Sequence, residues 1–336
     1  SQHNNLTDRP GGAGIHRSKG GPDPPTSRLE TGRLSAGPKR RYRASVHPLV
    51  AVHLAVLLFG AAGLFGKLVL LPPTLLVLGR VVFAAGALGV FLQWRERTGR
   101  AAGPGAADPA PPAARRWSLV GLGILLAIHW VTFFHAIQLS TVAIGLLTFA
   151  TFPIFTALLE PLLPGERFEA GTLAAAAVSL AGIAWVVPTP DWNDPYTQGA
   201  FWGVVSGATF ALLSLANRLW VRDTAAARLA FHQDLWAAVV LLPFLVTATR
   251  WPTPSEWLAL AFLGVVLTAG AHALFIHGLS GVRAGRAAVI ASLEPVYGVV
   301  LAVLVLGERP EARTLVGGAV VLAAAAWVSR PARANG

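Results

Sequence analysis

Apolar residues dominate the chain in blocks of about 20 positions, which short polar or Gly/Pro-rich segments separate. A helix of that length spans roughly 30 Å, the thickness of the hydrocarbon core of a bilayer. Alternation of apolar and polar positions over strand lengths is absent, which argues against a β-barrel. The pattern therefore predicts an all-α polytopic membrane protein with ten transmembrane helices, at about residues 48–69, 73–93, 117–137, 140–160, 170–188, 198–218, 229–249, 256–276, 284–306 and 312–329.

An apolar segment of the first half of the chain recurs in the second half, 142 positions later and without a gap. The segment that starts at Phe133 aligns with the one that starts at Phe275, and Pro153 aligns with Pro295. The repeating unit holds five predicted spans, an odd number, so the second copy enters the membrane in the opposite orientation. A 5+5 inverted repeat is typical of secondary transporters, whose substrate site lies where the two halves meet.

The repeat divides the chain into five predicted parts, with both termini in the cytoplasm. The first part is rich in Gly, Pro, Ser and Arg and has almost no apolar run, so we expect it to be disordered. The parts are the N-terminal tail (1–46), the first repeat with helices 1–5 (47–188), an external loop (189–197), the second repeat with helices 6–10 (198–330) and a cytoplasmic tail (331–336).

Composition and charge support a membrane location. Of 336 residues, 54% are hydrophobic and 13% are charged, which is more apolar surface than one soluble core can bury. The net charge of +11 does not indicate a nucleic-acid partner, because most of the 27 Lys and Arg residues lie on the side of the predicted N-terminus. Positive-inside insertion produces this bias, and it predicts a multi-pass protein of the cytoplasmic (inner) cell membrane.

The chain lacks the residues that disulfides, metal sites, ATP binding and catalysis would need. The chain has no Cys, which excludes disulfides, thiol nucleophiles and Cys metal ligands. The spacings from His129 to His135 and from His272 to His277 do not suit a helical metal pair, so no metal is expected. No Gly-rich phosphate-binding loop is present, so neither direct drive by ATP nor a cofactor is expected. No catalytic constellation is in register, and the chain is predicted not to be an enzyme.

Four groups of motifs, in this order and spacing, resemble the EamA-type members of the drug/metabolite transporter superfamily. They are Thr-Val-Ala-Ile-Gly at 141–145, Thr-Phe-Pro-Ile-Phe-Thr-Ala-Leu-Leu-Glu-Pro at 151–161, Ala-Ser-Leu-Glu-Pro-Val-Tyr-Gly at 291–298, and the Gly-Glu-Arg turns at 165–167 and 307–309. The resemblance covers about residues 47–330. It implies a ten-helix inverted-repeat carrier that moves small metabolites across the cytoplasmic membrane, often outward.

Together these features predict a secondary transporter of small metabolites that works by alternating access. Amino acids or related compounds are the expected substrates, export the expected direction, and coupling to protons one option. The expected partners are the small-molecule substrate and the lipid bilayer, without nucleic acid, and a homodimer stays open. Two alternatives also stay open from sequence: a membrane-embedded enzyme, and a non-transporting membrane sensor or scaffold.

Glu294 lies near the middle of the predicted span 284–306 and directly precedes Pro295. Pro295 removes a backbone hydrogen bond, so the helix should break at the depth where transporters place substrate and coupling-ion contacts. Glu294 is therefore a candidate for substrate binding or proton coupling, and a buried counter-ion is the alternative. Pro153 marks the equivalent break in the first repeat, where Phe152 stands in place of the carboxylate, so a proton role would be one-sided.

Arg80 lies well inside the second predicted span, at a place where EamA-type proteins commonly carry an Arg. Its guanidinium could bind a substrate carboxylate or phosphate through a forked pair of hydrogen bonds. The alternative is an internal ion pair with Glu294, or a bond to a carbonyl at the C-terminus of a helix. The two interpretations are compatible if a bound substrate displaces Glu294 from Arg80.

Aromatic residues surround a histidine in the third predicted span. His129 and Trp130 lie mid-span, with Phe133 and Phe134 one turn further along. These side chains could line a cavity that has an aromatic wall and one titratable group. The alternative is a packed core in which the histidine is satisfied.

A polar cluster lies about one turn inside the cytoplasmic face of the seventh predicted span. It contains Gln233 and Asp234, and Asn217 ends the sixth span close by. These three residues are candidates for a cytoplasmic gate or vestibule. For Asp234 we favour the alternative, in which the side chain reaches the interface beside nearby arginines.

The two Gly-Glu-Arg turns lie at opposite predicted interfaces. In each, Gly ends one helix, while Glu166 or Glu308 stands shortly before the next helix, where a carboxylate suits the N-terminus. We interpret both turns as structural.

Overall fold

The computed structural model describes residues 46–98, 113–162, 171–187, 191–220, 225–279, 281–282, 287 and 290–328. All of these residues belong to the unit formed by residues 44–336. The predictions for the tail at 1–46, the Gly-Glu-Arg turn at 165–167 and the tail at 331–336 fall almost wholly outside the described residues.

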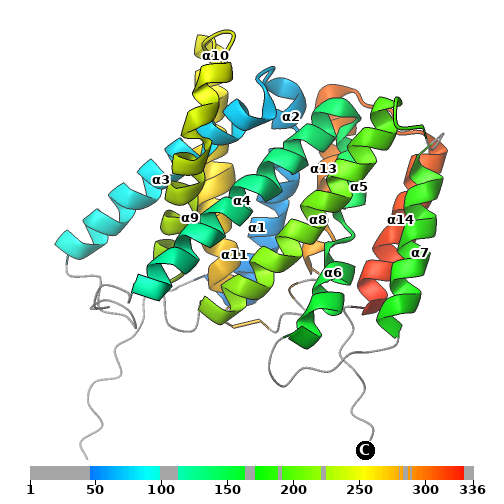
Figure 1. Cartoon of the computed structure of the whole chain (residues 1–336), viewed down its shortest axis with the longest axis horizontal. Helices are drawn as coiled ribbons and strands as arrows, with labels where there is room; N and C mark the ends of the chain where they lie inside the picture. Colours follow the sequence, from blue (N-terminus) through cyan, green and yellow to red (C-terminus); the bar gives the residue numbers. More distant parts are fainter. Residues whose placement is uncertain are drawn as a thin grey trace, which may run out of the picture. The chain divides into compact units, whose positions relative to one another are not determined.

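Helices account for all regular secondary structure in the described part of the chain, and they pack side by side (Figure 1). This confirms the all-α class. The helices are α1 (Pro48–Gly63), α2 (Phe65–Leu68), α3 (Pro73–Arg97), α4 (Ala113–Leu139), α5 (Val142–Phe149), α6 (Phe152–Leu159), η1 (Glu160–Leu162), α7 (Gly171–Val186), α8 (Pro195–Trp220), α9 (Ala226–Leu241), η2 (Leu242–Thr247), α10 (Pro254–Gly264), η3 (Val265–Gly270), α11 (Ala271–Leu279), α13 (Glu294–Leu301), η4 (Ala302–Leu306) and α14 (Ala312–Val328).

Within the described residues, seven helical stretches are long and apolar enough to cross a membrane. They are Pro48–Leu68, Pro73–Arg97, Trp117–Leu139, Val142–Leu162, Pro195–Asn217, Ala226–Thr247 and Pro254–Leu279. Three shorter apolar helices fall within the other predicted spans, at Gly171–Val186, Glu294–Leu306 and Ala312–Trp327. The seven long stretches agree with a multi-pass membrane protein, and the count of ten spans stays a prediction.

Two helices begin at a break that immediately precedes a proline. Helix α5 ends at Phe149 and α6 begins at Phe152, with Pro153 in its first turn. Helix α13 begins at Glu294, 142 positions after the start of α6, with Pro295 in its first turn. Proline suits the first turn of a helix because the amide hydrogens there have no intrahelical acceptor. Both breaks therefore follow from the local sequence.

The helices of the two predicted repeats pack against one another. Helix α4 packs against α8 and α9, α3 against α9 and α10, and α1 against α11 and α13. Helices α7 and α14 form a pair at one edge of the bundle (Figure 1). Their backbones touch where a Cβ atom on Gly317 would lie 2.6 Å from the carbonyl oxygen of Gly182. Close approach of this kind is typical of helix packing in lipid. There the hydrophobic effect does not drive helices together, and small residues allow close van der Waals packing between their backbones.

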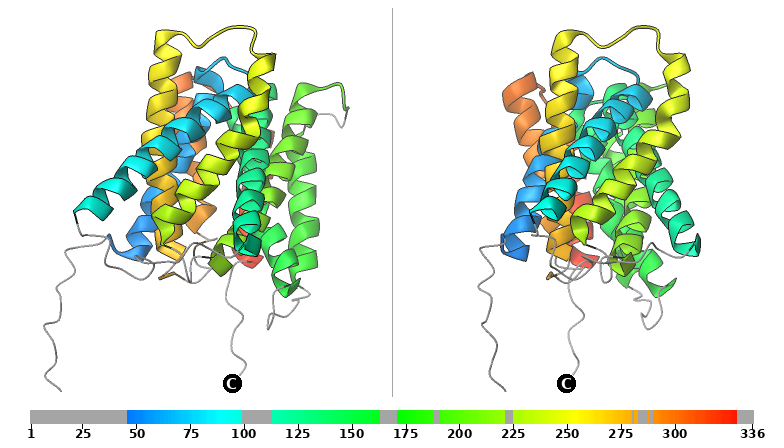
Figure 2. Two further views of the ribbon diagram at one scale, coloured as in Figure 1. Left: turned by 60° about the vertical axis from the view of Figure 1, so that its left-hand side comes forward. Right: turned by 90° about the vertical axis from the view of Figure 1, so that its left-hand side faces the viewer.

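The segment between α9 and α10 lies at the same end of the helices as α2 (Figure 2). Arg250 connects the two, because its Nη2 donates to the carbonyl oxygen of Leu70 at 2.9 Å. Both Nη atoms of Arg250 also donate to the Glu256 carboxylate, at 2.6 and 2.7 Å, and these bonds raise the pKa of Arg250 above its usual value. At the opposite end of α3, Arg228 forms an ion pair with Glu96 at 3.4 Å.

The Gly-Glu-Arg turn at 307–309 agrees with the prediction at its glycine and differs at its glutamate. Gly307 ends η4 in the left-handed conformation, with φ of 67°. The carboxylate of Glu308 does not serve the following helix. Its Oε1 accepts a hydrogen bond from the backbone nitrogen of Val142 at 3.0 Å, at the start of α5. The turn thus caps a helix of the other repeat.

Candidate functional site

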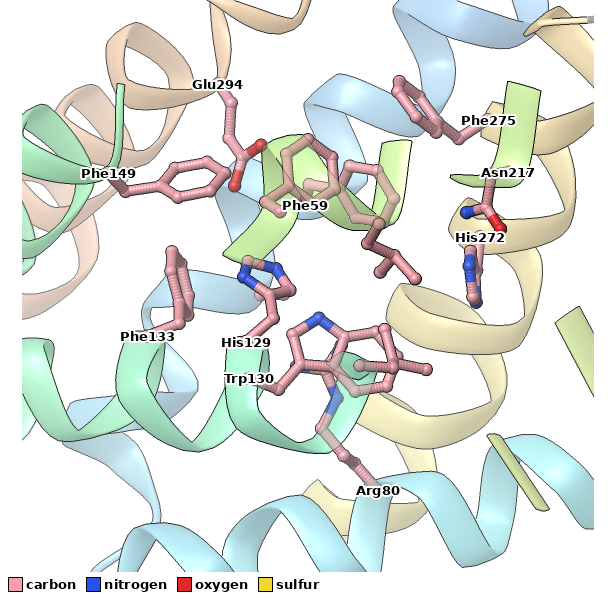
Figure 3. A pocket seen from close by; sticks show the side chains of 14 residues that line it. Phe59, Arg80, His129, Trp130, Phe133, Phe149, Asn217, His272, Phe275 and Glu294 are labelled. Atoms are coloured by element: carbon pink, nitrogen blue, oxygen red, sulfur yellow. The ribbon is translucent and has the colours of Figure 1, made fainter. Parts of the chain in front are cut away.

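A small cavity lies between α1, α3, α4, α8, α11, the end of α5 and the start of α13 (Figure 3). Its volume of about 40 Å³ has room for only a few water molecules. Six of the 14 residues that line it are Phe or Trp: Phe59, Trp130, Phe133, Phe149, Phe210 and Phe275. The polar side chains that reach it are Arg80, His129, Asn217, His272 and Glu294. An apolar pocket with a few convergent polar groups is the usual form of a small-molecule site.

Arg80 projects from α3 and is 1% exposed. Its guanidinium carbon lies 4.0 Å from the centre of the Trp130 ring and 5.1 Å from that of Phe134. Such cation–π contacts partly replace the lost hydration of a buried cation. Among the described residues, Arg80 has one hydrogen-bond partner, Thr268, and no ion pair. The ion pair with Glu294, which was the alternative interpretation of Arg80, is not formed in this structure, and the terminal nitrogens remain available to an anion.

Thr268 positions Arg80 from a distorted segment of the opposite helix. The Nε of Arg80 donates to Thr268 Oγ1 at 2.9 Å, and this hydroxyl donates in turn to the carbonyl oxygen of Leu263 at 2.7 Å. Thr268 lies in the π-helix η3, a helix type that is rare and often marks functional sites. Gly264 lets the two helices meet here, since a Cβ atom would lie 2.5 Å from the carbonyl oxygen of Arg80.

Glu294 lies across the cavity from Arg80 (Figure 3). It is the first residue of α13 and is 5% exposed. Helix α1 packs directly on this break, because a Cβ atom on Gly60 would lie 2.9 Å from the carbonyl oxygen of Glu294. Within the described part of the chain, the Glu294 side chain has no hydrogen bond or ion pair. The cavity thus has a cation and a carboxyl group on opposite sides.

His129 lines the cavity and is also hydrogen-bonded, so both sequence interpretations apply to it. Its Nδ1 lies 2.9 Å from the hydroxyl and 3.1 Å from the carbonyl oxygen of Ser206. The ring packs among Phe133, Phe149 and Phe210. Trp130 and Phe133 line the cavity as well. Phe134 is fully buried and is not among the residues that line the cavity; its ring contacts the guanidinium group of Arg80.

The polar cluster on α9 lies beside the cavity. The Nε2 of Gln233 donates to Oδ1 of Asn217, which lines the cavity. Asp234 is 0% exposed, and its Oδ1 lies 3.7 Å from Nδ1 of His272. The favoured interpretation, in which Asp234 reaches the interface, is wrong because the side chain is enclosed by neighbouring helices.

Sequence reasoning missed several residues of the site. His272 is an ionisable residue in a predicted span, and that feature alone could have singled it out. Phe59, Phe149 and Phe210 carry no local signal, because apolar residues fill every span. Among the described residues, no group of three or more His, Cys, Asp or Glu could hold a metal ion.

The chain is similar to a family of known transporters. A family model described as the EamA-like transporter family matches residues 48–187 and 197–330. An uncharacterized transporter of Archaeoglobus fulgidus is 30% identical over 206 residues, which are 61% of this chain and 74% of that protein. An S-adenosylmethionine uptake transporter of Rickettsia felis is 24% identical over 208 residues (61% and 69%). The aromatic amino acid exporter YddG of Ancylobacter novellus is 24% identical over 217 residues (63% and 75%).

A solved crystal structure has a similar fold. It superposes with a TM-score of 0.61 and 21% sequence identity, over 86% of this chain and 99% of that one. At this identity the likeness supports the fold alone.

Proposed function

The chain belongs to the EamA-like transporter family, and from that premise we propose that it is a secondary transporter of amino acids or related zwitterions that works by alternating access. Members of this family and the matched relatives are transporters, so the chain is a membrane transporter and not an enzyme. Among these relatives one is named for uptake and one for export. We propose that the direction of transport in this chain follows the gradients that act on it.

The proposal includes a ten-helix inverted repeat with both termini in the cytoplasm. The starts of α6 and α13 and the ends of α7 and α14 are each 142 positions apart, as the repeat requires. The cavity lies between helices of both repeats, with Arg80 and His129 from the first and Glu294 from the second. Inverted-repeat transporters bind their substrates at such an interface, next to discontinuous helices.

One observation carries the choice of substrate: Arg80 and Glu294 face each other across an aromatic-walled cavity, each without a charged partner among the described residues. A substrate carboxylate would bind the terminal nitrogens of Arg80, and a substrate ammonium group would bind Glu294. The aromatic wall would take the substrate's apolar part. One relative is named as an aromatic amino acid exporter, in agreement with this arrangement.

Transport by this site requires the cavity to widen. A volume of about 40 Å³ is far below the roughly 300–1,000 Å³ of ordinary ligand pockets, so no amino acid fits without helix movement. The breaks before α6 and α13 are suitable hinges, because backbone hydrogen bonding is already interrupted there. The Gln233–Asn217 hydrogen bond joins α8 to α9 beside the cavity, and we assign it a gating role.

Counterflow in proteoliposomes tests the function. Vesicles loaded with L-phenylalanine should exchange it for external radiolabelled L-phenylalanine, with biotin and a nucleoside as comparison substrates. Arg80→Gln should raise the apparent KM at least tenfold, which is about 1.4 kcal/mol, because it removes the charge that binds the carboxylate. Glu294→Gln should weaken binding in the same way.

Arg228→Gln is the matched control, since this arginine lies at the end of the helices, and it should exchange at the wild-type rate. Unchanged kinetics in Arg80→Gln, or no amino-acid exchange by the wild type, would refute the proposal.

A further inference from the structure

Asp234 is a carboxyl group that the protein encloses without supplying a donor. The side chain is 0% exposed, and neither Oδ1 nor Oδ2 has a hydrogen-bond partner among the described residues. An ionised carboxylate in this state costs several kcal/mol, more still inside a membrane span. Binding of a proton on Asp234 itself, or on a group beside it, would therefore remove most of this cost.

His272 is that group. Its Nδ1 on α11 faces Asp234 Oδ1 on α9 at 3.7 Å, and it also has no hydrogen-bond partner in the described part of the chain. A neutral acid could donate to this nitrogen, or a protonated imidazole could donate to the carboxylate, after a shift of under 1 Å. One proton held between the two residues satisfies both of them.

Few other charged or titratable groups of the described residues lie near the pair. Of the helices packed around α9, α3 contributes Arg80, which interacts electrostatically with Asp234. Helix α4 contributes His129, which Ser206 holds by hydrogen bonds, and α8 contributes the neutral Asn217. Glu294 lies across the cavity and interacts with Arg80. Among the described residues outside the pair, Arg80 is the charged group that interacts with Asp234.

We propose that Asp234 and His272 form a proton-binding site, separate from Glu294, that couples substrate movement to proton movement. The inference rests on the proposed transport function, because the coupling passes through the substrate site. His272 lines the cavity, its ring contacts Trp130 edge to face at 5.9 Å, and Trp130 in turn supports Arg80.

The sign of the coupling follows from the charges. When a substrate carboxylate neutralises Arg80, the favourable interaction between Arg80 and an ionised Asp234 is lost. The pair then takes up a proton from water, and by linkage a bound proton strengthens substrate binding by the same factor. Substrate and proton are therefore expected to move in the same direction.

Infrared spectroscopy tests the proton site without any substrate. The purified full-length protein in lipid nanodiscs should show a carboxylic acid C=O band that titrates with pH. The band should persist in Glu294→Gln, disappear in Asp234→Asn and shift in His272→Gln. A titrating band that survives in the double variant Glu294→Gln/Asp234→Asn, or one that His272→Gln leaves in place, would overturn the proposal. Thermal unfolding of each variant separates the loss of a band from the loss of the fold.

A transport experiment tests the coupling. In liposomes with radiolabelled L-phenylalanine, the ratio of pH-driven accumulation to counterflow should fall at least tenfold in Asp234→Asn and His272→Gln. Asp191→Asn is the matched control, because this aspartate is exposed, and its ratio should equal that of the wild type. An unchanged ratio in Asp234→Asn overturns the coupling. If the wild type exchanges no amino acid, the proposed function fails, and the infrared titration still decides the proton site.

Discussion

Arg80 is a buried cation that its neighbours contact without supplying a negative charge. Two aromatic faces and one hydroxyl group contact it, and none of them neutralises it. The sequence could identify Arg80 and Glu294, because ionisable residues at mid-span depth are costly and rare. It could not identify Thr268, which is 188 residues from Arg80 along the chain and resembles any other small polar residue in a span.

Replacing Thr268 by Val tests whether this hydroxyl positions the arginine. The substitution nearly conserves volume but removes the acceptor for Arg80 Nε. A hydrogen bond to a charged group contributes about 1.5–3 kcal/mol. We therefore expect the apparent KM for L-phenylalanine counterflow to rise about tenfold or more, with a smaller change in maximal rate.

The conservative variant Thr268→Ser provides the control, because it keeps the hydroxyl group. Its KM should stay within about twofold of the wild-type value. A wild-type KM in Thr268→Val would mean that the hydrogen bond from Thr268 in η3 is not needed to position Arg80.

Helix breaks were predictable where proline causes them and unpredictable where packing does. Pro153 and Pro295 mark the starts of α6 and α13, and both were expected from the sequence. The π-helices η3 and η4 contain no proline, and their residues resemble those of the regular helices around them. Their geometry depends on contacts with other helices, such as the bond between Thr268 and Arg80, which no local pattern encodes.

Glu308 shows the same limit at a helix terminus. The expected role at the start of the next helix follows a local rule, whereas the observed partner, the backbone nitrogen of Val142, is 166 residues away. Lys67 lies close to this cap, since its Nζ donates to the carbonyl oxygen of Ser140 at 2.6 Å. The cap therefore joins elements of both predicted repeats at one end of the bundle.

Truncation of Glu308 should measure the value of this cap. Loss of a capping side chain costs about 1 kcal/mol, so Glu308→Ala should lower the free energy of unfolding by that amount. Glu308→Gln should lose less, because its amide oxygen can still accept from Val142. Thermal unfolding in detergent measures both variants. Glu311→Ala replaces an exposed glutamate of the same segment and should have no effect, and an equal loss in Glu311→Ala would contradict the capping role.

At the scale of the whole molecule, helix α3 runs from one end of the bundle to the other. It has 25 residues, so its ends are about 37 Å apart at 1.5 Å per residue, and one helix of this length can cross the membrane. Leu70, just before α3, is bound by Arg250, so the start of α10 lies at the same end. Arg95, Arg97 and Arg228 lie at the other end, and from the positive-inside rule we expect this end to face the cytoplasm.

Single-cysteine labelling tests this orientation on a chain that has no cysteine of its own. Ser255 is exposed in the first turn of α10, and Thr98 is exposed at the C-terminus of α3. In intact cells a membrane-impermeant maleimide should label Ser255→Cys, and it should label Thr98→Cys only after permeabilisation. The unmodified chain should stay unlabelled in both cases. The reverse pattern would mean that the topology is inverted. Labelling of both cysteines in intact cells would mean that α3 does not cross the membrane, and Arg80 would then not lie at the middle of the bilayer.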